Sequence, residues 1–195
     1  YRIYGTEPLF VWDPNDDSNR PVRGVHVNEI KFWPAYPQFV HDVFIEAFSQ
    51  SSLIGEDTKH RVQEKKWQEV FTELRNVTVH CSCGGETFID VNKSSSQCIN
   101  CGADIPRGHV MKVMKHNVVL APGNKVYSCH VVLDSDDFKE TKGEIVTSKM
   151  DATLIGLRND TDSTWNVTLP NGVSKSYTRG QVIKIGKGLK INFGN

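Results

Sequence analysis

Cysteine is the residue type in this 195-residue chain whose number and spacing most clearly allow chemistry. Four of the five cysteines form two pairs separated by 14 residues, Cys81 with Cys83 and Cys98 with Cys101. Glycine follows each pair, as in a zinc knuckle, where a tight turn brings two thiolates onto one metal. Four thiolates leave no open coordination position, so the sequence predicts one structural Zn²⁺ per chain. Such a metal stabilises a small module by on the order of 10 kcal/mol.

The fourth ligand has two candidate assignments. The first pair is Cys-x-Cys, one residue shorter than the usual Cys-x-x-Cys, whereas His80 and Cys83 have the usual two-residue gap. We favour Cys81 and keep His80 as the alternative. Disulfides would need an oxidising compartment, to which nothing in the chain points, and a redox pair is disfavoured because the second pair completes a metal site. Cys129 lies among apolar residues and is predicted to be a core thiol in a strand.

The residues between the two pairs predict a zinc ribbon over residues 79–106. Residues 86–91 have the composition of a strand, and the polar run at 92–96 predicts a hairpin loop. A strand and a loop of this length carry the second pair of cysteines back toward the first.

The first 78 residues predict helices. Apolar residues recur at helical spacing in two stretches, one from Pro37 to Phe48 and one over Val62–Asn76. A shorter helix is expected over Asn28–Trp33, which the following proline would end. The Asp/Asn-rich segment 13–19 lacks calcium-loop spacing and is predicted to be a turn. We therefore expect a helical segment over residues 1–78, either a remnant or an extension of a preceding lobe.

Residues 107–195 predict strands. Short β-prone stretches alternate with turns, and the Asn-Gly at 171–172 is a strong hairpin signal. Their spacing predicts a small β-sandwich or barrel. For the whole chain we expect an α+β fold, with helices and strands in separate segments. The expected strands lie within 110–119 and at 125–133, 143–148, 153–157, 164–169, 173–177, 181–185 and 189–193, the last two forming a hairpin.

The composition argues against several classes of function. Lys+Arg and Asp+Glu both number 23, so the chain has no net charge, which disfavours nucleic-acid binding and a polybasic membrane anchor. No apolar run approaches the roughly 20 residues that span a bilayer, and no signal peptide is evident, so we expect a cytoplasmic protein without a membrane partner. The first residue is Tyr rather than Met, which suggests a fragment. Nucleophile-elbow, P-loop, zinc-protease and dinucleotide motifs are missing.

Three stretches together resemble one protein family. The loop 8–21 (PLFVWDPNDDSNRP), the aromatic helix pattern from Tyr36 to Phe48, and the segment 61–67 (RVQEKKW) are similar to the region after the catalytic core in a group of bacterial serine/threonine protein kinases. In that group a zinc ribbon and a β-rich tail follow. The chain has no kinase Gly-rich loop, V-A-I-K lysine, H-R-D or D-F-G. The resemblance therefore implies a non-catalytic C-terminal region of such a kinase.

The resemblance also implies partners. Kinases of this group occur beside a von Willebrand A domain protein of the tellurite-resistance (TerY-like) type and a metal-dependent serine/threonine phosphatase, and the three are thought to form a phosphorylation signalling set. A von Willebrand A domain presents Mg²⁺ with an unfilled position that a partner carboxylate can complete. The expected function is docking by a loop carboxylate. The candidates are Asp134, Asp136, Asp137, Asp160 and Asp162, followed by Asp16 and Asp17.

Two other functions compete with docking. In one, the ribbon binds nucleic acid through Lys112, Lys115, Lys125 and the C-terminal strands, with Phe88 or Trp165 stacking on bases. The uneven charge supports it locally, because five bases and no acid follow residue 163. The other is an enzyme with His80 at an open metal site, which the four available thiolates disfavour.

Overall fold

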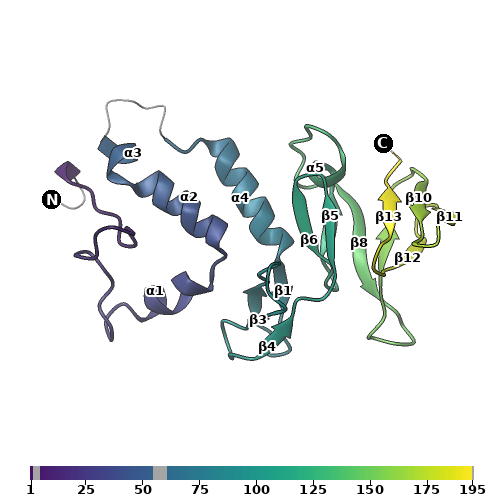
Figure 1. Ribbon diagram of the computed structural model, residues 1–195, viewed down its shortest axis with the longest axis horizontal. Coiled ribbons are helices and arrows are strands. Elements are labelled where there is room, and N and C mark those ends of the chain that lie inside the picture. The colour runs from purple at the N-terminus through teal and green to yellow at the C-terminus, as the bar shows by residue number, and fades with distance from the viewer. Residues whose placement is uncertain (2–4, 55–60, 195) are drawn as a thin grey trace. The chain divides into compact units, whose positions relative to one another are not determined.

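The computed structural model describes residues 1, 5–54 and 61–194, which divide into two compact units. The first, termed the helical unit, comprises Tyr1–Phe88 and Gln97–Asp104, and the second, termed the β unit, comprises Ile89–Ser96 and Ile105–Asn195 (Figure 1). Helices and antiparallel sheets are both present, which confirms the α+β class. The expected division at residues 78 and 106 stays a prediction.

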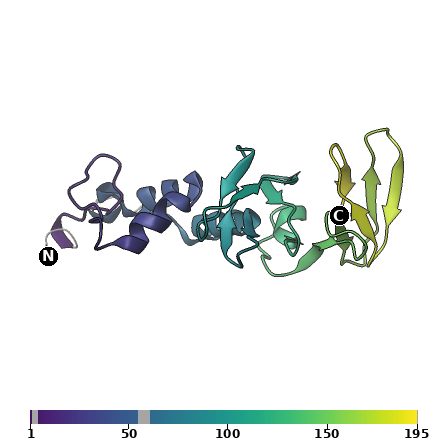
Figure 2. The ribbon, with the colours of Figure 1, turned by 90° about the horizontal axis from the view of Figure 1, so that it is seen from below.

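The predicted helices of the helical unit are confirmed in the structure. Helix α1 spans Val27–Phe32 and passes into the 3₁₀ turn η2, Trp33–Ala35. Helix α2 spans Gln38–Phe48, directly after Pro37, and α4 spans Glu64–Asn76 (Figure 2). Sequence analysis missed the short helix α3, Gln50–Ile54. None of the helices in the described parts of the chain is both long enough and apolar enough to cross a bilayer.

Apolar faces of α2 and α4 form the core of the helical unit. Val40 and Val43 of α2 are buried with Val70 of α4. The rings of Phe44 and Trp67 meet edge to face with centroids 5.1 Å apart, a favoured aromatic geometry. The core thus uses the positions that the helical spacing predicted.

The ribbon contains four short strands. Strand β1, Thr78–His80, pairs with β2, Glu86–Phe88, and β3, Ser95–Gln97, pairs with β4, Asp104–Pro106. The expected strand over 86–91 is therefore shorter than predicted, and the expected loop at 92–96 ends inside β3. Strand β3 is all Ser and Gln, so neither apolar alternation nor β-propensity marked it in the sequence.

The β unit contains the remaining strands and one short helix. The stretch 110–119 forms a hairpin of two strands, and the expected strand 125–133 is wrong after residue 127, where the chain enters helix α5. The imidazole Nδ1 of His130 accepts a hydrogen bond from the backbone N–H of Tyr127 and so caps this helix. Cys129 is buried as expected, but in α5. The elements are β5 Val110–Val113, β6 His116–Val119, β7 Lys125–Tyr127, α5 Ser128–Val131, β8 Thr141–Thr147, β9 Ile155–Asn159, β10 Trp165–Thr168, β11 Ser174–Tyr177, β12 Val182–Lys184 and β13 Lys190–Asn192.

Two larger sheets build the β unit. One has the order β12-β9-β8-β7 and the other the order β11-β10-β13. Strands β12 and β13 do not form the expected hairpin, because β12 pairs with β9 and β13 pairs with β10. The short loop between them carries the chain from one sheet to the other. Whether the two sheets form a sandwich or a barrel stays a prediction.

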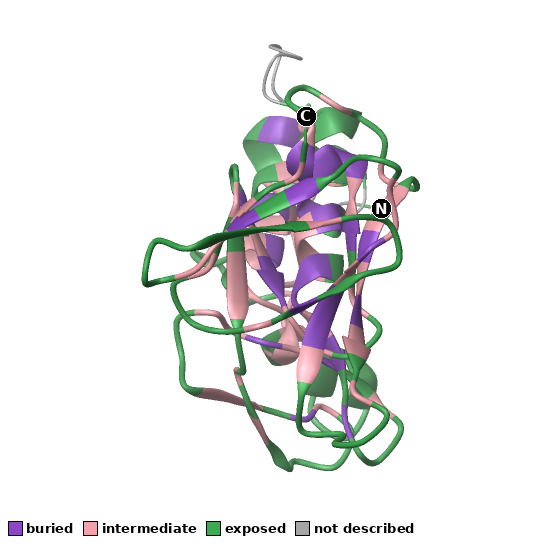
Figure 3. Ribbon diagram, turned by 90° about the vertical axis from the view of Figure 1, so that its right-hand side faces the viewer, coloured by how far each residue is buried: buried purple, intermediate pink, exposed green. Residues whose placement is uncertain are grey.

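Both sheets contribute to one apolar core. Trp165 and Val167 of β10 are fully buried with Ile145, Leu157 and Ile183 of the four-stranded sheet. Figure 3 colours the ribbon by burial and shows strands that combine buried and exposed segments. A Cβ at Gly143 would lie 2.7 Å from the Trp165 ring, so the indole fits only because β8 has no side chain there.

A fully buried asparagine ties the end of β9 to neighbouring segments. The amide nitrogen of Asn159 donates to the carbonyl oxygens of Ser163 at 2.8 Å and Tyr177 at 3.0 Å. Its amide oxygen accepts from the backbone N–H and the hydroxyl of Thr161, both at 2.8 Å. A buried amide with all its hydrogen bonds satisfied specifies one arrangement of these segments.

Replacing this amide should destabilise the β unit. We expect Asn159→Ala to lower the free energy of unfolding by about 2–3 kcal/mol, because a fully buried amide is removed and the carbonyls of Ser163 and Tyr177 lose their donor. Urea unfolding followed through the indole NMR signal of Trp165 measures the change in the β unit. Asn166→Ala is the control, since Asn166 is exposed and should cost under about 0.5 kcal/mol. Equal losses in the two variants would contradict the assigned role.

Candidate metal centre

Four cysteine thiols converge in the helical unit. The Sγ atoms of Cys81, Cys83, Cys98 and Cys101 all lie within 4.8 Å of one another. The Sγ–Sγ distance is 3.8 Å between Cys81 and Cys101 and 3.7 Å between Cys83 and Cys98. A disulfide would bring two sulfurs to about 2.05 Å, so these thiols surround a common centre and are not bonded in pairs.

Tight backbone turns hold both pairs. In the first, the N–H of Cys81 donates to the carbonyl of Gly85 at 2.8 Å, and Gly84 adopts a φ of 83°, which favours glycine. In the second, the N–H of Cys98 donates to the carbonyl of Ala103 at 2.8 Å. The first turn is one residue shorter, as its Cys-x-Cys spacing requires, yet it closes with an equivalent hydrogen bond.

The two turns also contact each other beside the cluster. The side-chain amide of Asn100 donates to the sulfur of Cys83 at 3.6 Å, from the second turn to the first. A Cβ at Gly85 would lie 3.0 Å from the Cβ of Asn100 and 3.4 Å from the Cys83 sulfur. Glycine at this position therefore lets the turns approach closely.

Hydrogen bonds favour the thiolate form of two ligands. The backbone N–H of Gly85, assisted by the amide of Asn100, lowers the pKa of Cys83 to about 6. The backbone N–H of Cys101 lowers the pKa of Cys98 in the same direction. Because the thiolate is the form that binds metals, these donors favour metal binding by Cys83 and Cys98.

His80 lies outside the cluster. Its side chain is 67% exposed, and its Nε2 lies 3.9 Å from a carboxylate oxygen of Glu86 on the neighbouring strand. Alternation along β1 explains this, because successive side chains point to opposite faces and Val79 is the buried one. The structure thus gathers Cys81 with the other three cysteines and leaves His80 apart.

The arrangement can hold one metal ion. Four sulfurs at tetrahedral spacing suit Zn²⁺ or iron, whereas Mg²⁺ and Ca²⁺ prefer oxygen ligands. Comparison with protein-family models, with the curated proteins and with solved structures found no match to this chain. The interpretation of the site therefore depends on its own geometry.

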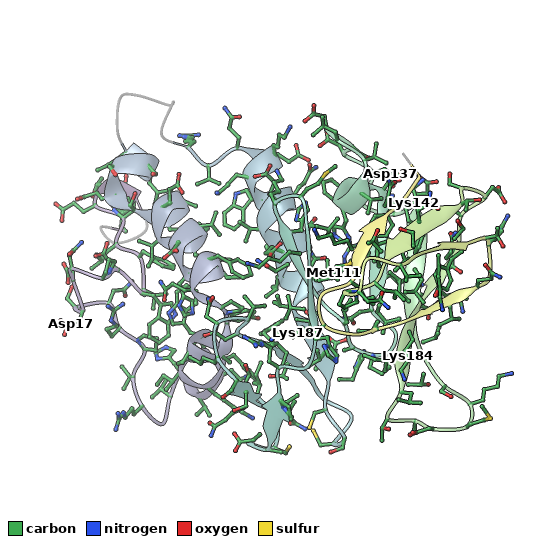
Figure 4. The ribbon with its side chains drawn as sticks, turned by 45° about the vertical axis from the view of Figure 1, so that its right-hand side comes forward. Asp17, Met111, Asp137, Lys142, Lys184 and Lys187 are labelled. Carbon is green, nitrogen blue, oxygen red and sulfur yellow. The ribbon has the colours of Figure 1, made fainter. Side chains whose placement is uncertain are left out.

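The structure brings five of the candidate docking carboxylates to one end of the β unit, whereas Asp16 and Asp17 lie in the helical unit. The loop at 132–140 leads into β8, and the loop at 160–164 leaves β9, its neighbour. The backbone N–H of Asp160 donates to the carbonyl of Lys142 at 2.9 Å, which ties the second loop to the start of β8 directly after the first loop. Figure 4 labels Asp137 and Lys142 at this end, which we term the acidic end.

Three of the five carboxylates have local partners. Asp137 accepts the backbone N–H groups of Glu140 and Lys139, each at 2.8 Å, and these bonds lower its pKa. Asp160 pairs with Arg158 at 2.5 Å and Asp162 with Arg179 at 2.8 Å. Among the described residues, Asp134 and Asp136 are exposed and no bond of their carboxylates is observed. Asp134 has a φ of 56°, so its backbone also has a conformational role.

The proposed base-stacking residues are not available as the nucleic-acid alternative requires. Trp165 is 0% exposed in the core of the β unit. Phe88 is half-buried and stacks on Tyr36 with ring centroids 5.2 Å apart. The alternative therefore loses its aromatic platform, although its lysines remain at the surface.

Sequence reasoning missed two residues that shape the metal centre. Asn100 lies between the ligands of the second pair, where its type carries no metal-binding signal. Gly85 carries no metal-binding signal either, and the approach of Asn100 explains why a Cβ at this position would be crowded. The roles of Asn100 and Gly85 both arise from the packing of the two cysteine-bearing turns against each other.

Ligand identity can be tested with Co²⁺, whose spectrum reports thiolate coordination. We expect one Co²⁺ per chain with intense thiolate charge-transfer bands and tetrahedral d–d bands. Cys81→Ser should weaken binding by at least tenfold, and His80→Ala should leave both affinity and spectrum unchanged. If His80→Ala weakened binding and Cys81→Ser did not, the imidazole of His80 would be a ligand in place of Cys81.

A second variant tests the close approach of the turns. Gly85→Ala should increase the rate of metal loss to a chelator severalfold, because the new Cβ forces the turns apart. Gly24→Ala, at a glycine with nothing within 4 Å of the added Cβ, is the control for altering an exposed turn elsewhere. Equal rates of metal loss would contradict the packing role of Gly85.

Proposed function

We propose that the chain is a non-catalytic docking segment whose central ribbon is held by one structural Zn²⁺. The observation that carries this proposal is the closed set of four thiols. In a tetrahedral site with Zn–S bonds of about 2.3 Å, sulfurs lie about 3.8 Å apart, which agrees with the distances of 3.8 and 3.7 Å. With every position filled by sulfur, a substrate or water has no place on the metal.

The docking role rests on the resemblance to the tail of a bacterial serine/threonine kinase. The family's partner is a von Willebrand A domain protein of the TerY-like type, in a cytoplasmic phosphorylation set linked to tellurite resistance, with a metal-dependent phosphatase as a further partner. The acidic end supplies carboxylates at the surface, as a Mg²⁺-bridged contact requires.

Asp136 is the best-suited carboxylate at that end. It is exposed on a loop whose backbone is held by the hydrogen bonds to Asp137. A rigid loop lowers the entropy cost of presenting one side chain to a partner. In this proposal Asp137 and Asp160 position the loops, and Asp136 completes the coordination of Mg²⁺.

Calorimetry with a purified TerY-like von Willebrand A domain tests the contact. We expect Asp136→Asn to weaken binding by about tenfold or more, equivalent to about 1.4 kcal/mol, because the amide retains the shape but not the charge. Glu29→Gln, at an exposed acid of the helical unit that is not among the candidate docking carboxylates, is the control. Binding should also require Mg²⁺ in the buffer while one zinc per chain stays bound.

The outcomes separate the parts of the proposal. Binding that survives in Mg²⁺-free buffer would replace the metal bridge with an ordinary protein interface. No binding in either buffer would overturn the docking proposal but leave the zinc site intact. Absence of zinc from the purified chain would overturn the structural role of the four thiols.

A further inference from the structure

The zero net charge of the chain conceals two opposite charges. The helical unit contains 9 Lys+Arg and 14 Asp+Glu, whereas the β unit contains 14 Lys+Arg and 9 Asp+Glu. The β unit is therefore cationic when considered by itself. Most of its acids lie in residues 134–162, and none lies in 105–133 or 163–195.

Three loops meet at the end of the β unit opposite the acidic end. They are residues 148–154 between β8 and β9, 169–173 between β10 and β11, and 185–189 between β12 and β13. The N–H of Ile185 donates to the carbonyl of Ile155 at 3.3 Å, and a Cβ at Gly188 would lie 3.4 Å from Pro170. The three loops are therefore contiguous, and we term this region the basic end.

Four lysines lie at or beside these loops. All four are exposed, and within the described chain none has an ion-pair partner. One acid, Asp151, is present, and its carboxylate accepts the backbone N–H and the hydroxyl of Thr153. Figure 4 labels two of the lysines away from Asp137 and Lys142 of the acidic end. The lysines are Lys149, Lys184, Lys187 and Lys190.

Exposed apolar side chains lie among the lysines. Met150 is 97% exposed at the tip of the first loop, Leu154 is 43% exposed at its end, and Val173 is 49% exposed in the second loop. The first loop is closed by a hydrogen bond from the N–H of Ser148 to the carbonyl of Leu154 at 2.8 Å. Met150 is thus presented on an ordered turn.

We propose that the basic end binds the surface of a bilayer rich in anionic phospholipids. Lysines near such a surface are attracted to the headgroup phosphates, each changing affinity by about fivefold, and an exposed Met on a loop tip can enter the headgroup–acyl boundary. This proposal departs from the expectation of no membrane partner, which rested on the zero net charge of the whole chain and on the lack of a spanning segment. Here the fold gathers lysines from separate segments.

A lipid surface fits these loops better than nucleic acid does. Residues 148–154, 169–173 and 185–189 contain no aromatic residue, so the basic end offers no platform for stacked bases. Apolar residues at the tips of loops have no role on a phosphodiester backbone, whereas a bilayer buries them. The combination of charge and exposed aliphatic side chains therefore favours lipid.

Vesicle sedimentation of the 195-residue chain tests this inference. We expect binding to vesicles of phosphatidylglycerol and phosphatidylcholine, weakened by salt, and at least tenfold weaker binding to phosphatidylcholine alone. Lys149→Glu with Lys187→Glu should lower the affinity by at least tenfold. Lys139→Glu, an exposed lysine near the acidic end, is the control and should change it less than threefold.

Met150→Ser separates insertion from charge. It changes no charge and should still lower vesicle affinity severalfold, with little effect on folding because the side chain is almost fully exposed. Failure to bind anionic vesicles would overturn the proposal. So would binding to single-stranded or duplex DNA that depends on the same lysines while vesicles are not bound, or equal effects of the variants at the two ends. The vesicle experiment involves no protein partner, so its outcome is independent of the docking proposal.

Discussion

Closure of the four thiols around one centre is the constraint on which the ribbon depends. Between residues 78 and 106 the buried apolar side chains are few, chiefly Val79 and Ile89, and two of the other buried residues are cysteine ligands. Short strands with so small a core do not hold themselves together in water. A metal bound to all four sulfurs would supply the missing stabilisation, and the N–H donors that lower the pKa of Cys83 and Cys98 favour the thiolate form that binds it.

The sequence predicted those elements that are marked by residue spacing within a single segment. Periodic apolar residues located α2 and α4, and the paired cysteines, each pair followed by glycine, located the cluster of four thiols. The shortened first pair left His80 as an alternative ligand. In the structure the alternation of β1 directs Val79 inward and His80 outward, which separates His80 from the four thiols.

Other features depend on contacts between distant segments, which one sequence does not encode locally. The sequence of β12, the turn and β13 is typical of a hairpin, yet each strand pairs within a different sheet. The reason is that the inward residues of the two strands belong to a core that both sheets share. Asn159 lies outside the strand expected at 153–157, yet it is fully buried, and both the oxygen and the nitrogen of its amide form hydrogen bonds. The separation of charge into an acidic and a basic end also arises only from this topology, since alternating strand directions send acid-rich loops one way and lysine-bearing loops the other.

The central claim is that all four sulfurs bind a single zinc ion. X-ray absorption at the zinc K-edge of the purified chain tests it most directly, because the first shell reports the type, number and distance of the ligands. The account predicts four sulfurs at about 2.3 Å and no nitrogen or oxygen. A shell of three sulfurs with a nitrogen or oxygen at about 2.0–2.1 Å would contradict it, because it would imply either an imidazole ligand or a position open to water.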